Sequence, residues 1–388
     1  MTHPTPPDAP AISTVPLDAW HRALGARMVP FAGYALPVQY APEGALAARC
    51  RGGVIAEHVH ARSQAALFDV SHMGQAWLIG PGAAAALERL APGDIAGLRP
   101  GRQRYTLLTN DAGGIIDDLM VSRPAATDGP ERLFLVVNAA RKAIDFPHIA
   151  AALPSGLRLE TLEDRVLLAL QGPRAAEALG RLCPAAAALP FMGVTEAAVS
   201  GIPCLISRSG YTGEDGFELS APAARAESLA DALLAQPEVA PAGLGARDSL
   251  RLEAGLCLYG HDIDETTTPV EAGLVWVLGK RRREALDFPG GAAIGAQLAG
   301  GCARLRVGLR PDGRAPARDG TAILTESGGA AGTVTSGGFS PTLNAPIAMG
   351  YVPTTLAAAG TRLALIVRGK ALPAAVVPLP FVPHRYRA

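Results

Sequence analysis

The sequence predicts an α+β protein of more than one domain that ends in a separate all-β domain. Its 388 residues exceed the roughly 100–200 residues of one ordinary domain. Its 44 glycines and 33 prolines, in a chain that is 49% hydrophobic, are typical of many short strands joined by tight turns. Helix and strand patterns alternate in the first part of the chain, and only strand patterns follow. We therefore expect a disordered leader over residues 1–14, an α+β region over residues 15–300 and a β domain over residues 301–388.

Charge and composition exclude several classes of protein. Lysines plus arginines number 35, as do aspartates plus glutamates, so the basic excess that binds a phosphate backbone is missing and no nucleic-acid partner is expected. No stretch reaches the roughly 18 apolar residues of a membrane span, so no membrane partner is expected. The five cysteines form no Cys-x-x-Cys pair, which favours free thiols in a reducing compartment. Residues 1–11 lack the features of a targeting segment, which predicts a cytoplasmic location.

Periodicity and turn residues predict the first elements in chain order. Residues 16–24 form a short helix, because Pro16 suits its first turn and Gly25 the position after its end. Residues 28–40 indicate a loop or irregular strand, because glycine and proline interrupt the apolar pattern. Residues 41–53 fit either a helix or an insertion.

Two hairpins dominate the middle of the chain. Strand, glycine-rich turn and strand succeed one another over residues 105–121 and again over residues 204–220. The other elements predicted here are strands over residues 133–137 and 166–170, a helix that ends near residue 182, and helices over residues 223–235 and 244–254.

Short strands alone are predicted beyond Cys302. Glycine or proline separates the alternating apolar segments, which is typical of a small β domain. These segments cover residues 305–309, 321–325, 332–336, 348–352 and 362–367.

Two adjacent carboxylates interrupt the apolar strand of the first hairpin. Because side chains alternate along a strand, Asp117 and Asp118 face opposite sides. If the side shared by Ile116, Asp118 and Met120 lines a cleft, Asp118 is partly desolvated and can accept hydrogen bonds or act as a base with a raised pKa. The alternative is a structural carboxylate beside a turn, and spacing alone leaves both open.

Residues 210–218 concentrate three glycines, two aromatic residues and three carboxylates. Alternation after Gly216 directs Glu218 toward the interior and leaves Glu214 and Asp215 at a solvated loop tip. A plain hairpin with solvated acids is the alternative. The pattern alone does not decide between a binding loop and this hairpin.

Several common functional motifs are missing from the chain. It has no Gly-Lys-Ser/Thr phosphate loop, no Gly-x-Gly-x-x-Gly after a strand and no Gly-x-Ser-x-Gly elbow, so neither a nucleotide nor a flavin cofactor is expected. The closely spaced histidines have no further ligand at metal spacing, so no metal is expected. In the helix over residues 244–254, Asp248 and Arg251 lie three apart, as in a surface ion pair.

A further set of motifs falls in one order along the chain. They are Phe31-Ala32-Gly33-Tyr34, Phe68-Asp69-Val70-Ser71-His72-Met73-Gly74, Gly113-Gly114-Ile115-Ile116-Asp117-Asp118-Leu119, Leu170-Gln171-Gly172-Pro173, Gly210-Tyr211-Thr212-Gly213-Glu214-Asp215-Gly216-Phe217-Glu218, Gly245-Ala246-Arg247-Asp248, Tyr259-Gly260-His261-Asp262, Thr335-Ser336-Gly337-Gly338 and Pro380-Phe381-Val382-Pro383. Over residues 15–387 this order resembles the glycine cleavage T-protein family, the aminomethyltransferases.

The resemblance implies a fold and a reaction. The fold is a folate-binding antiparallel β unit with an inserted ferredoxin-like α+β unit, followed by a C-terminal β-barrel or jelly-roll domain. Members of this family take the aminomethyl group from the lipoyl arm of the H protein, release ammonia and pass the methylene carbon to tetrahydrofolate. The implied partners are therefore lipoylated H protein and tetrahydrofolate as co-substrate, without a metal or a flavin.

The resemblance also assigns site residues. Asp118 matches an essential aspartate near the reactive folate nitrogens, and Glu218 matches a carboxylate that accepts hydrogen bonds from the pterin. The other folate-binding candidates are Arg247, Tyr386, Tyr105, Tyr211 and Asn138, and charge alone assigns Arg385 to the glutamate tail.

Three alternatives share the implied fold. A folate-dependent demethylase would come with a flavin domain, whose fingerprint is missing. A non-catalytic folate-binding factor for iron–sulfur cluster assembly carries a Lys-Gly-Cys-Tyr-x-Gly-Gln-Glu motif that this chain lacks. A binding module without activity is disfavoured by the presence of Asp118. Residues 41–53 exceed the usual family spacing, so the H-protein docking surface stays unassigned, as do the oligomeric state and the polyglutamate preference.

Overall fold

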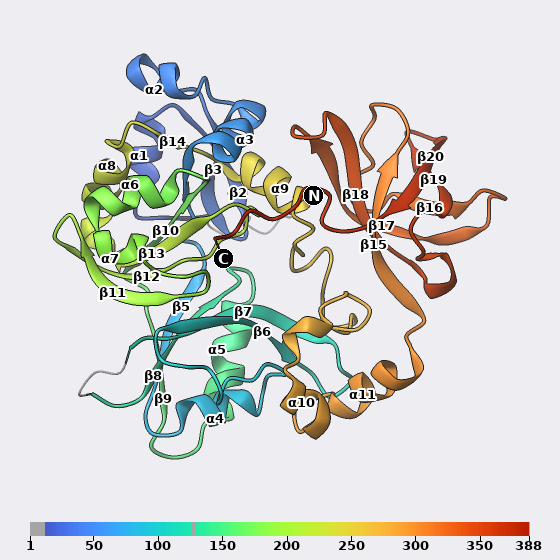
Figure 1. Cartoon of the computed structure of the whole chain (residues 1–388), viewed down its shortest axis with the longest axis horizontal. Helices are drawn as coiled ribbons and strands as arrows, with labels where there is room; N and C mark the ends of the chain where they lie inside the picture. Colours follow the sequence, from blue (N-terminus) through green and yellow to red (C-terminus); the bar gives the residue numbers. More distant parts are fainter. Residues whose placement is uncertain (1–11, 126–128, 388) are drawn as a thin grey trace, which may run out of the picture.

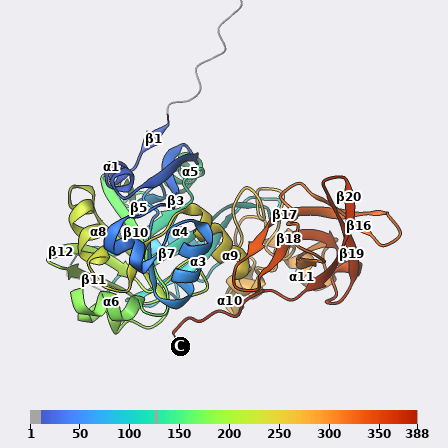
Figure 2. The same cartoon turned by 90° about the horizontal axis from the view of Figure 1, so that it is seen from above.

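The structure is a computed structural model that describes residues 12–125 and 129–387. Figure 1 shows three groups of elements: a blue-to-green group at the upper left, a teal group below it and an orange-to-red barrel at the right. Figure 2 shows the barrel standing beside the other two groups. Of the leader expected over residues 1–14, residues 1–11 lie outside the described part, and Ser13–Thr14 form strand β1. Within the described ranges, no helix is long and apolar enough to cross a membrane.

A small three-stranded sheet of order β1-β3-β2 begins the chain. Strands β2 (Ala26–Phe31) and β3 (Tyr34–Tyr40) form a hairpin whose register shifts between Arg27 and Met28, so the irregular strand expected over residues 28–40 is in fact two paired strands joined by a turn. The turn residues Ala32 and Gly33 both have positive φ, 48° and 84°, which matches the twist of a two-residue hairpin. Alanine is an unusual residue for such a turn, which is why the sequence pattern does not show it. The neighbouring helices are α1 (Asp18–Ala23) and α2 (Gly44–Arg49).

A six-stranded sheet with helices on both faces forms the rest of the N-terminal group. Its strands, in spatial order, are β11 (Val194–Val199), β12 (Ile202–Ser207), β13 (Gly216–Pro222), β10 (Arg165–Gln171), β4 (Ala65–Asp69) and β14 (Val239–Pro241). Its helices are α3 (Val54–Ser63), α6 (Ala175–Leu182), α7 (Pro184–Ala187), η1 (Ala223–Arg225), α8 (Ala226–Leu234) and α9 (Leu244–Glu253). Leu168 and Leu170 of β10 pack with α6 and α8, whereas Leu167 and Ala169 pack with α3 and α9. Alternation along β10 thus builds two apolar layers.

A five-stranded sheet of order β6-β7-β8-β5-β9 forms the teal group in Figure 1. Strands β6 (Arg102–Thr109) and β7 (Ile115–Arg123) are the first predicted hairpin. The other elements are β8 (Arg132–Val137), β5 (Gly74–Ile79), β9 (Arg158–Thr161), α4 (Ala83–Glu88) and α5 (Lys142–Ala151). Leu87 of α4 and Ile149 of α5 cover one face. The other face meets the six-stranded sheet, because Phe134 of β8 packs against Val194 and Leu205.

The C-terminal strands close into a barrel of order β15-β18-β17-β16-β19-β20. They are β15 (Arg304–Pro311), β16 (Ala322–Thr325), β17 (Ala330–Ser340), β18 (Ala345–Pro353), β19 (Arg362–Val367) and β20 (Lys370–Val377). This confirms the predicted α+β fold with a C-terminal β-barrel. Sequence reasoning missed β20, because alanines and Pro373 are poor strand residues. The connecting helices are η2 (Val275–Val277), α10 (Lys280–Ala285) and α11 (Gly291–Gly300), and η3 (Thr354–Leu356) lies between β18 and β19.

Polar contacts join the barrel to the N-terminal group. Arg251 of α9 donates to Asp262 Oδ2 and to Ser336 Oγ, both at 2.9 Å. The predicted ion pair with Asp248 forms at 2.7 Å; its carboxylate is exposed, as predicted, but Arg251 is only 3% exposed, so the pair is buried on the arginine side. The C-terminal tail returns from the barrel across the N-terminal group (Figure 1), where the Arg385 backbone N–H donates to the Gly213 carbonyl at 2.8 Å.

Candidate active site

Strand β7 places its two aspartates on opposite faces, as alternation predicts. Asp117 is fully buried on the face that also holds Leu119 and Val121. Asp118 lies on the other face with Met120, and Met120 lines a cavity toward the six-stranded sheet. The face that carries Asp118 is therefore the one turned toward the space between the two sheets.

Asn138, directly after β8, ties the two aspartates together. Its Nδ2 donates to Asp118 Oδ1 at 2.7 Å and to Asp117 Oδ1 at 2.9 Å, and its backbone N–H donates to Asp117 Oδ2 at 3.0 Å. Burial raises the pKa of Asp118 to about 7, Asp117 adds to the rise, and hydrogen bonds from Tyr105 and Asn138 oppose it. A carboxyl group with this pKa can exchange a proton near neutral pH.

A third aspartate, Asp145 of α5, belongs to this cluster and was missed by sequence reasoning. It is fully buried, and Asp117 and Asp145 each act on the pKa of the other, so their carboxyl groups are neighbours in the fold. Burial raises the pKa of Asp117 to about 8, and the charge of Asp145 contributes to this rise. Burial also raises the pKa of Asp145 to about 6. The only sign of a buried Asp145 in the sequence is its position between the apolar residues Ile144 and Phe146. A carboxylate in such a position is equally typical of a solvated helix face.

The loop that joins β12 to β13 needs all three of its glycines. A Cβ at Gly210 would lie 1.7 Å from Gln171 Oε1, and a Cβ at Gly216 would lie 2.4 Å from Gln171 Nε2. Gly213 has a φ of 74°, which favours glycine. The loop therefore wraps closely around the buried Gln171 side chain and presents Tyr211 and Glu218 from fixed positions.

The expectation that Glu214 and Asp215 are solvated is wrong. Glu214 is 1% exposed, and its Oε1 accepts from Arg62 Nη1 at 2.7 Å and from Arg385 Nε at 3.0 Å. Asp215 accepts from Arg208 Nε at 2.8 Å. The two partners of Glu214 lie 152 and 171 residues away in the sequence, so no local pattern could have shown them.

Glu218 points inward from β13, as alternation predicts, and lies near Arg247. Ser209 Oγ donates to Glu218 Oε2 at 3.2 Å. Burial raises the pKa of Glu218, whereas the positive charge of Arg247 and the bond from Ser209 oppose the rise. The Arg247 guanidinium lies 4.8 Å from the centre of the Tyr211 ring, and its Nη1 is buried without a hydrogen-bond partner among the described residues. A ligand with an acceptor group would satisfy this donor.

A narrow cavity of about 10 Å³ marks where the two sheets meet. This is room for about one water molecule, so the cavity as it stands is too small to hold a ligand. It is lined by Gln103, Met120, Ser122, Phe134, Val136, Leu167, Leu205, Ser207, Glu218 and Ser220. Glu218 and the Asp118 face of β7 thus border one space.

Trp276 of η2 is a second residue that sequence reasoning missed. It is 65% exposed and stacks on Tyr105, with ring centres 5.4 Å apart and planes at 23°. Tyr105 in turn lies close enough to Asp118 to lower its pKa, so the indole forms an exposed aromatic wall beside the carboxyl cluster. In the sequence, a tryptophan between Val275 and Val277 looks like a residue of the apolar core, so the pattern gives no sign that this side chain is exposed.

Tyr386 is the candidate that the structure does not bring to the carboxyl cluster. It stacks on Phe191, with ring centres 4.4 Å apart and planes at 9°. Burial raises its pKa to about 12, and Arg62 and Glu214 are the charged groups that act on it. Arg385, assigned to a glutamate tail, already donates to Glu214. The structure therefore gathers Asp118, Asn138, Tyr105, Tyr211, Arg247 and Glu218, and places Tyr386 and Arg385 around Glu214.

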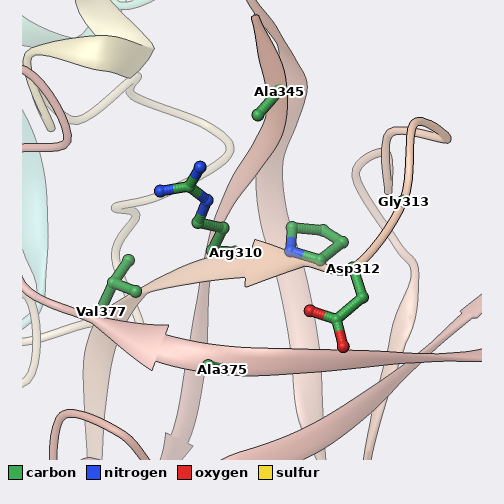
Figure 3. A pocket seen from close by; sticks show the side chains of 7 residues that line it. Arg310, Asp312, Gly313, Ala345, Ala375 and Val377 are labelled. Carbon is green, nitrogen blue, oxygen red and sulfur yellow. The ribbon is translucent and has the colours of Figure 1, made fainter. Parts of the chain in front are cut away.

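An open hollow of about 300 Å³ on the barrel is a poor candidate for the site. Figure 3 shows its charged residues, Arg310 and Asp312, pointing apart. None of the site residues predicted from the sequence lines it. Over residues 12–125 and 129–387, no group of three or more His, Cys, Asp or Glu side chains is arranged to hold a metal ion.

Comparisons with known proteins cover almost the whole chain. A family model described as the GCVT N-terminal domain matches residues 17–282, and one described as the glycine cleavage T-protein C-terminal barrel domain matches residues 304–383. A mitochondrial aminomethyltransferase of Gallus gallus is 49% identical over 383 residues, 97% of this chain and 94% of that protein. The one of Homo sapiens is 47% identical over 379 residues, 96% of this chain and 90% of that protein. A crystal structure of the glycine cleavage system aminomethyltransferase T from Bartonella henselae matches with a TM-score of 0.90 and 42% identity, and covers 97% of this chain and 100% of that one.

The comparisons overturn the cytoplasmic location expected from the sequence. The relatives from Gallus gallus, Homo sapiens and Dictyostelium discoideum are all named mitochondrial, which contradicts the expected cytoplasmic location. The expectation rested on residues 1–11, which show no recognisable targeting segment and lie outside the described residues. A missing local signal does not determine where a chain resides.

Proposed function

The chain belongs to the glycine cleavage T-protein family and is an aminomethyltransferase of the glycine cleavage system, and from this premise we propose that its substrates are lipoylated H protein and tetrahydrofolate. The aminomethyl group on the lipoyl sulfur supplies the carbon, which becomes the methylene bridge between N5 and N10 of the folate. The C–S and C–N bonds of that group break, and two new C–N bonds form. The protons lost from N5 and N10 end on the ammonia and on the dihydrolipoyl thiol, so the reaction needs no oxidant or reductant.

One observation carries this proposal. Asp118 and Glu218 lie on strand faces that turn toward each other: Met120 and Ser122, on the same face of β7 as Asp118, line one narrow cavity together with Glu218 of β13. Burial raises the pKa of both, but Arg247 opposes the rise at Glu218, whereas Asp117 adds to it at Asp118. Environments that push the pKa values of two carboxyl groups apart give them different roles. We assign proton exchange to Asp118 and the role of a charged hydrogen-bond acceptor to Glu218.

Glu218 and Arg247 supply complementary groups for a pterin. The adjacent ring N–H and exocyclic amine of a pterin are two parallel donors, which one carboxylate can accept together. The unpartnered Arg247 Nη1 offers a donor to a pterin acceptor. The Tyr211 ring beneath Arg247 and the stacked Tyr105–Trp276 pair are aromatic surfaces against which the folate rings can pack.

Asp118 acts on the reacting end of the folate. Its Oδ1 accepts from Asn138 Nδ2 at 2.7 Å, so its direction is fixed before the substrate binds. A carboxylate fixed in this way orients the N–H nucleophile and accepts its proton as the methylene bridge forms. Asp118 contributes mainly by positioning, and its pKa of about 7 lets it return the proton.

The domain division also remains a proposal, with residues 15–300 forming the folate-binding region and residues 301–388 the barrel domain. Its support is the barrel that begins at Arg304 and the two family matches, which break between residues 282 and 304.

The test is the formation of 5,10-methylenetetrahydrofolate and ammonia from aminomethylated H protein and tetrahydrofolate, with the purified chain as the sole enzyme. The proposal predicts equal amounts of both products, and no folate product when the lipoyl group is missing. Folate binding by calorimetry without turnover would contradict the proposed reaction and favour a non-catalytic folate-binding protein.

A further inference from the structure

The carboxyl cluster contains more carboxyl groups than the proposed reaction uses. Asp117 and Asp145 are fully buried, and Asp118 lies beside Asp117. Three carboxylates at such close range cannot all be ionised without a large electrostatic cost. At least one proton is therefore held within the cluster when the site is empty.

The position of this proton follows from the hydrogen bonds. Both oxygens of Asp145 are buried, and within the described part of the chain no N–H or hydroxyl group donates to them. A buried polar group without a partner is costly, and Asp117 is the side chain that acts most strongly on the pKa of Asp145. Both oxygens of Asp117 accept from Asn138, so a carboxylic O–H on Asp117 can point to Asp145 without breaking those bonds.

We propose that Asp117 and Asp145 share one proton and that this pair, acting through Asn138, positions Asp118 and keeps a full negative charge off Asp117. The proposal rests on the proposed function, since Asp118 is the group assigned to the transfer. It makes Asp117 and Asp145 positioning residues, because neither is placed against the substrate.

The charged groups around the pair favour this arrangement. Arg141, directly before α5, acts on Asp145 and pairs with Glu265 at 2.6 Å. Tyr259 lies under the Arg141 guanidinium at 5.1 Å and donates its hydroxyl to the Ile115 carbonyl at 3.1 Å. The positive charge of Arg141 favours the ionised form at Asp145, whereas the charges of Asp118 and Glu265 oppose it. The pKa of Asp117, about 8, stays above that of Asp145, about 6, so the proton resides mainly on Asp117, next to Asp118.

The variant Asp145→Asn tests the pair directly. Asparagine carries no negative charge to hold the proton on Asp117, and its NH₂ can donate to an ionised Asp117, so the substitution favours ionised Asp117 beside Asp118. We expect the titration midpoint of Asp118 to rise by about one pH unit, and the midpoint of the acidic limb of the kcat profile to rise with it, while the KM for tetrahydrofolate changes less than twofold.

Two other variants complete the comparison. Asp117→Asn removes the carboxyl group next to Asp118 and one of the acceptors that Asn138 uses, so kcat falls, but neither the Asp118 midpoint nor the kcat midpoint rises. Asp111→Asn, on the exposed turn of the same hairpin, is the matched control and should shift neither midpoint.

Two readouts separate this proposal from the proposed function. The first is ¹³Cγ NMR titration of the unliganded protein, with the Asp118 signal assigned from its loss in Asp118→Asn. The second is the pH profile of methylenetetrahydrofolate formation. A shifted NMR midpoint without turnover in the wild type would support the pair and contradict the proposed function. Wild-type turnover with the same Asp118 midpoint in Asp145→Asn and Asp111→Asn would overturn the pair.

If Asp145→Asn does not fold, infrared spectroscopy of the wild type decides the question. The proposal predicts a protonated-carboxyl C=O band at neutral pH that persists in Asp118→Asn. The loss of this band in Asp118→Asn would place the proton on Asp118 and overturn the shared pair.

Discussion

Glu218→Gln should weaken tetrahydrofolate binding much more than it slows the reaction of bound substrate. Ser209 donates to Glu218 Oε2 at 3.2 Å, so the glutamine oxygen is expected to keep this bond and turn its NH₂ toward the pterin donors. The charge-assisted hydrogen bond from the pterin to the carboxylate is then lost, because the glutamine NH₂ and the pterin N–H are both donors. A hydrogen bond to a charged group contributes about 1.5–3 kcal/mol, so a loss of about 2 kcal/mol raises the Kd by about thirtyfold.

Anaerobic calorimetry with tetrahydrofolate measures this Kd, and kcat at saturating folate shows whether the chemical step is retained. Glu227→Gln, an exposed residue at the start of α8, is the matched control and should bind as the wild type does. A Glu218→Gln variant with a Kd within threefold of the wild type would show that this carboxylate does not hold the pterin.

Three further predictions concern stability and the aromatic wall. Arg251→Met leaves Asp262 buried without its partner and should lower the free energy of unfolding by about 3–5 kcal/mol, measured by urea denaturation; a loss below about 1 kcal/mol would contradict the role of Arg251 in joining the barrel to α9. Trp276→Ala removes an exposed ring from Tyr105 and should lower kcat/KM about two- to tenfold at an unchanged Tm, and a drop in Tm would instead identify Trp276 as a core residue. The raised pKa of Asp118, about 7, stabilises the folded state below its unfolded pKa of about 4 and loses this contribution as pH rises to about 7. By urea denaturation of the unliganded proteins, the wild type should therefore lose about 4 kcal/mol more stability over this window than Asp118→Asn does, and equal slopes would refute the assignment.

Local patterns predicted the elements whose signals are local. The β6–β7 hairpin follows from an apolar strand, a glycine-rich turn and a second apolar strand, and the same alternation separates Asp117 from Asp118. The inward direction of Glu218 follows from alternation after Gly216. These inferences need only the period of a strand, which neighbouring residues already contain.

Long-range contacts explain what the sequence did not show. In the sequence, Glu214 looks like a solvated acid at the tip of a loop. In the structure it is paired with Arg62 and Arg385, which come from distant parts of the chain. Asp145 looks like an ordinary helix residue until β7 brings Asp117 beside it. Trp276 looks like a core residue, yet it stacks on the open side of Tyr105. In each case the partner is set by tertiary packing, which a local pattern does not encode.

The central claim is that the carboxyl group of Asp118 acts on bound folate in the transfer step. The most direct test compares Asp118→Asn with the wild type under single-turnover conditions, with the Kd for tetrahydrofolate measured on the same samples. The account predicts a transfer rate lower by about 10²–10⁴-fold and a Kd within about threefold of the wild type. A variant that transfers the carbon at the wild-type rate would contradict the account, and a variant that fails only because it no longer binds folate would make Asp118 a binding residue instead.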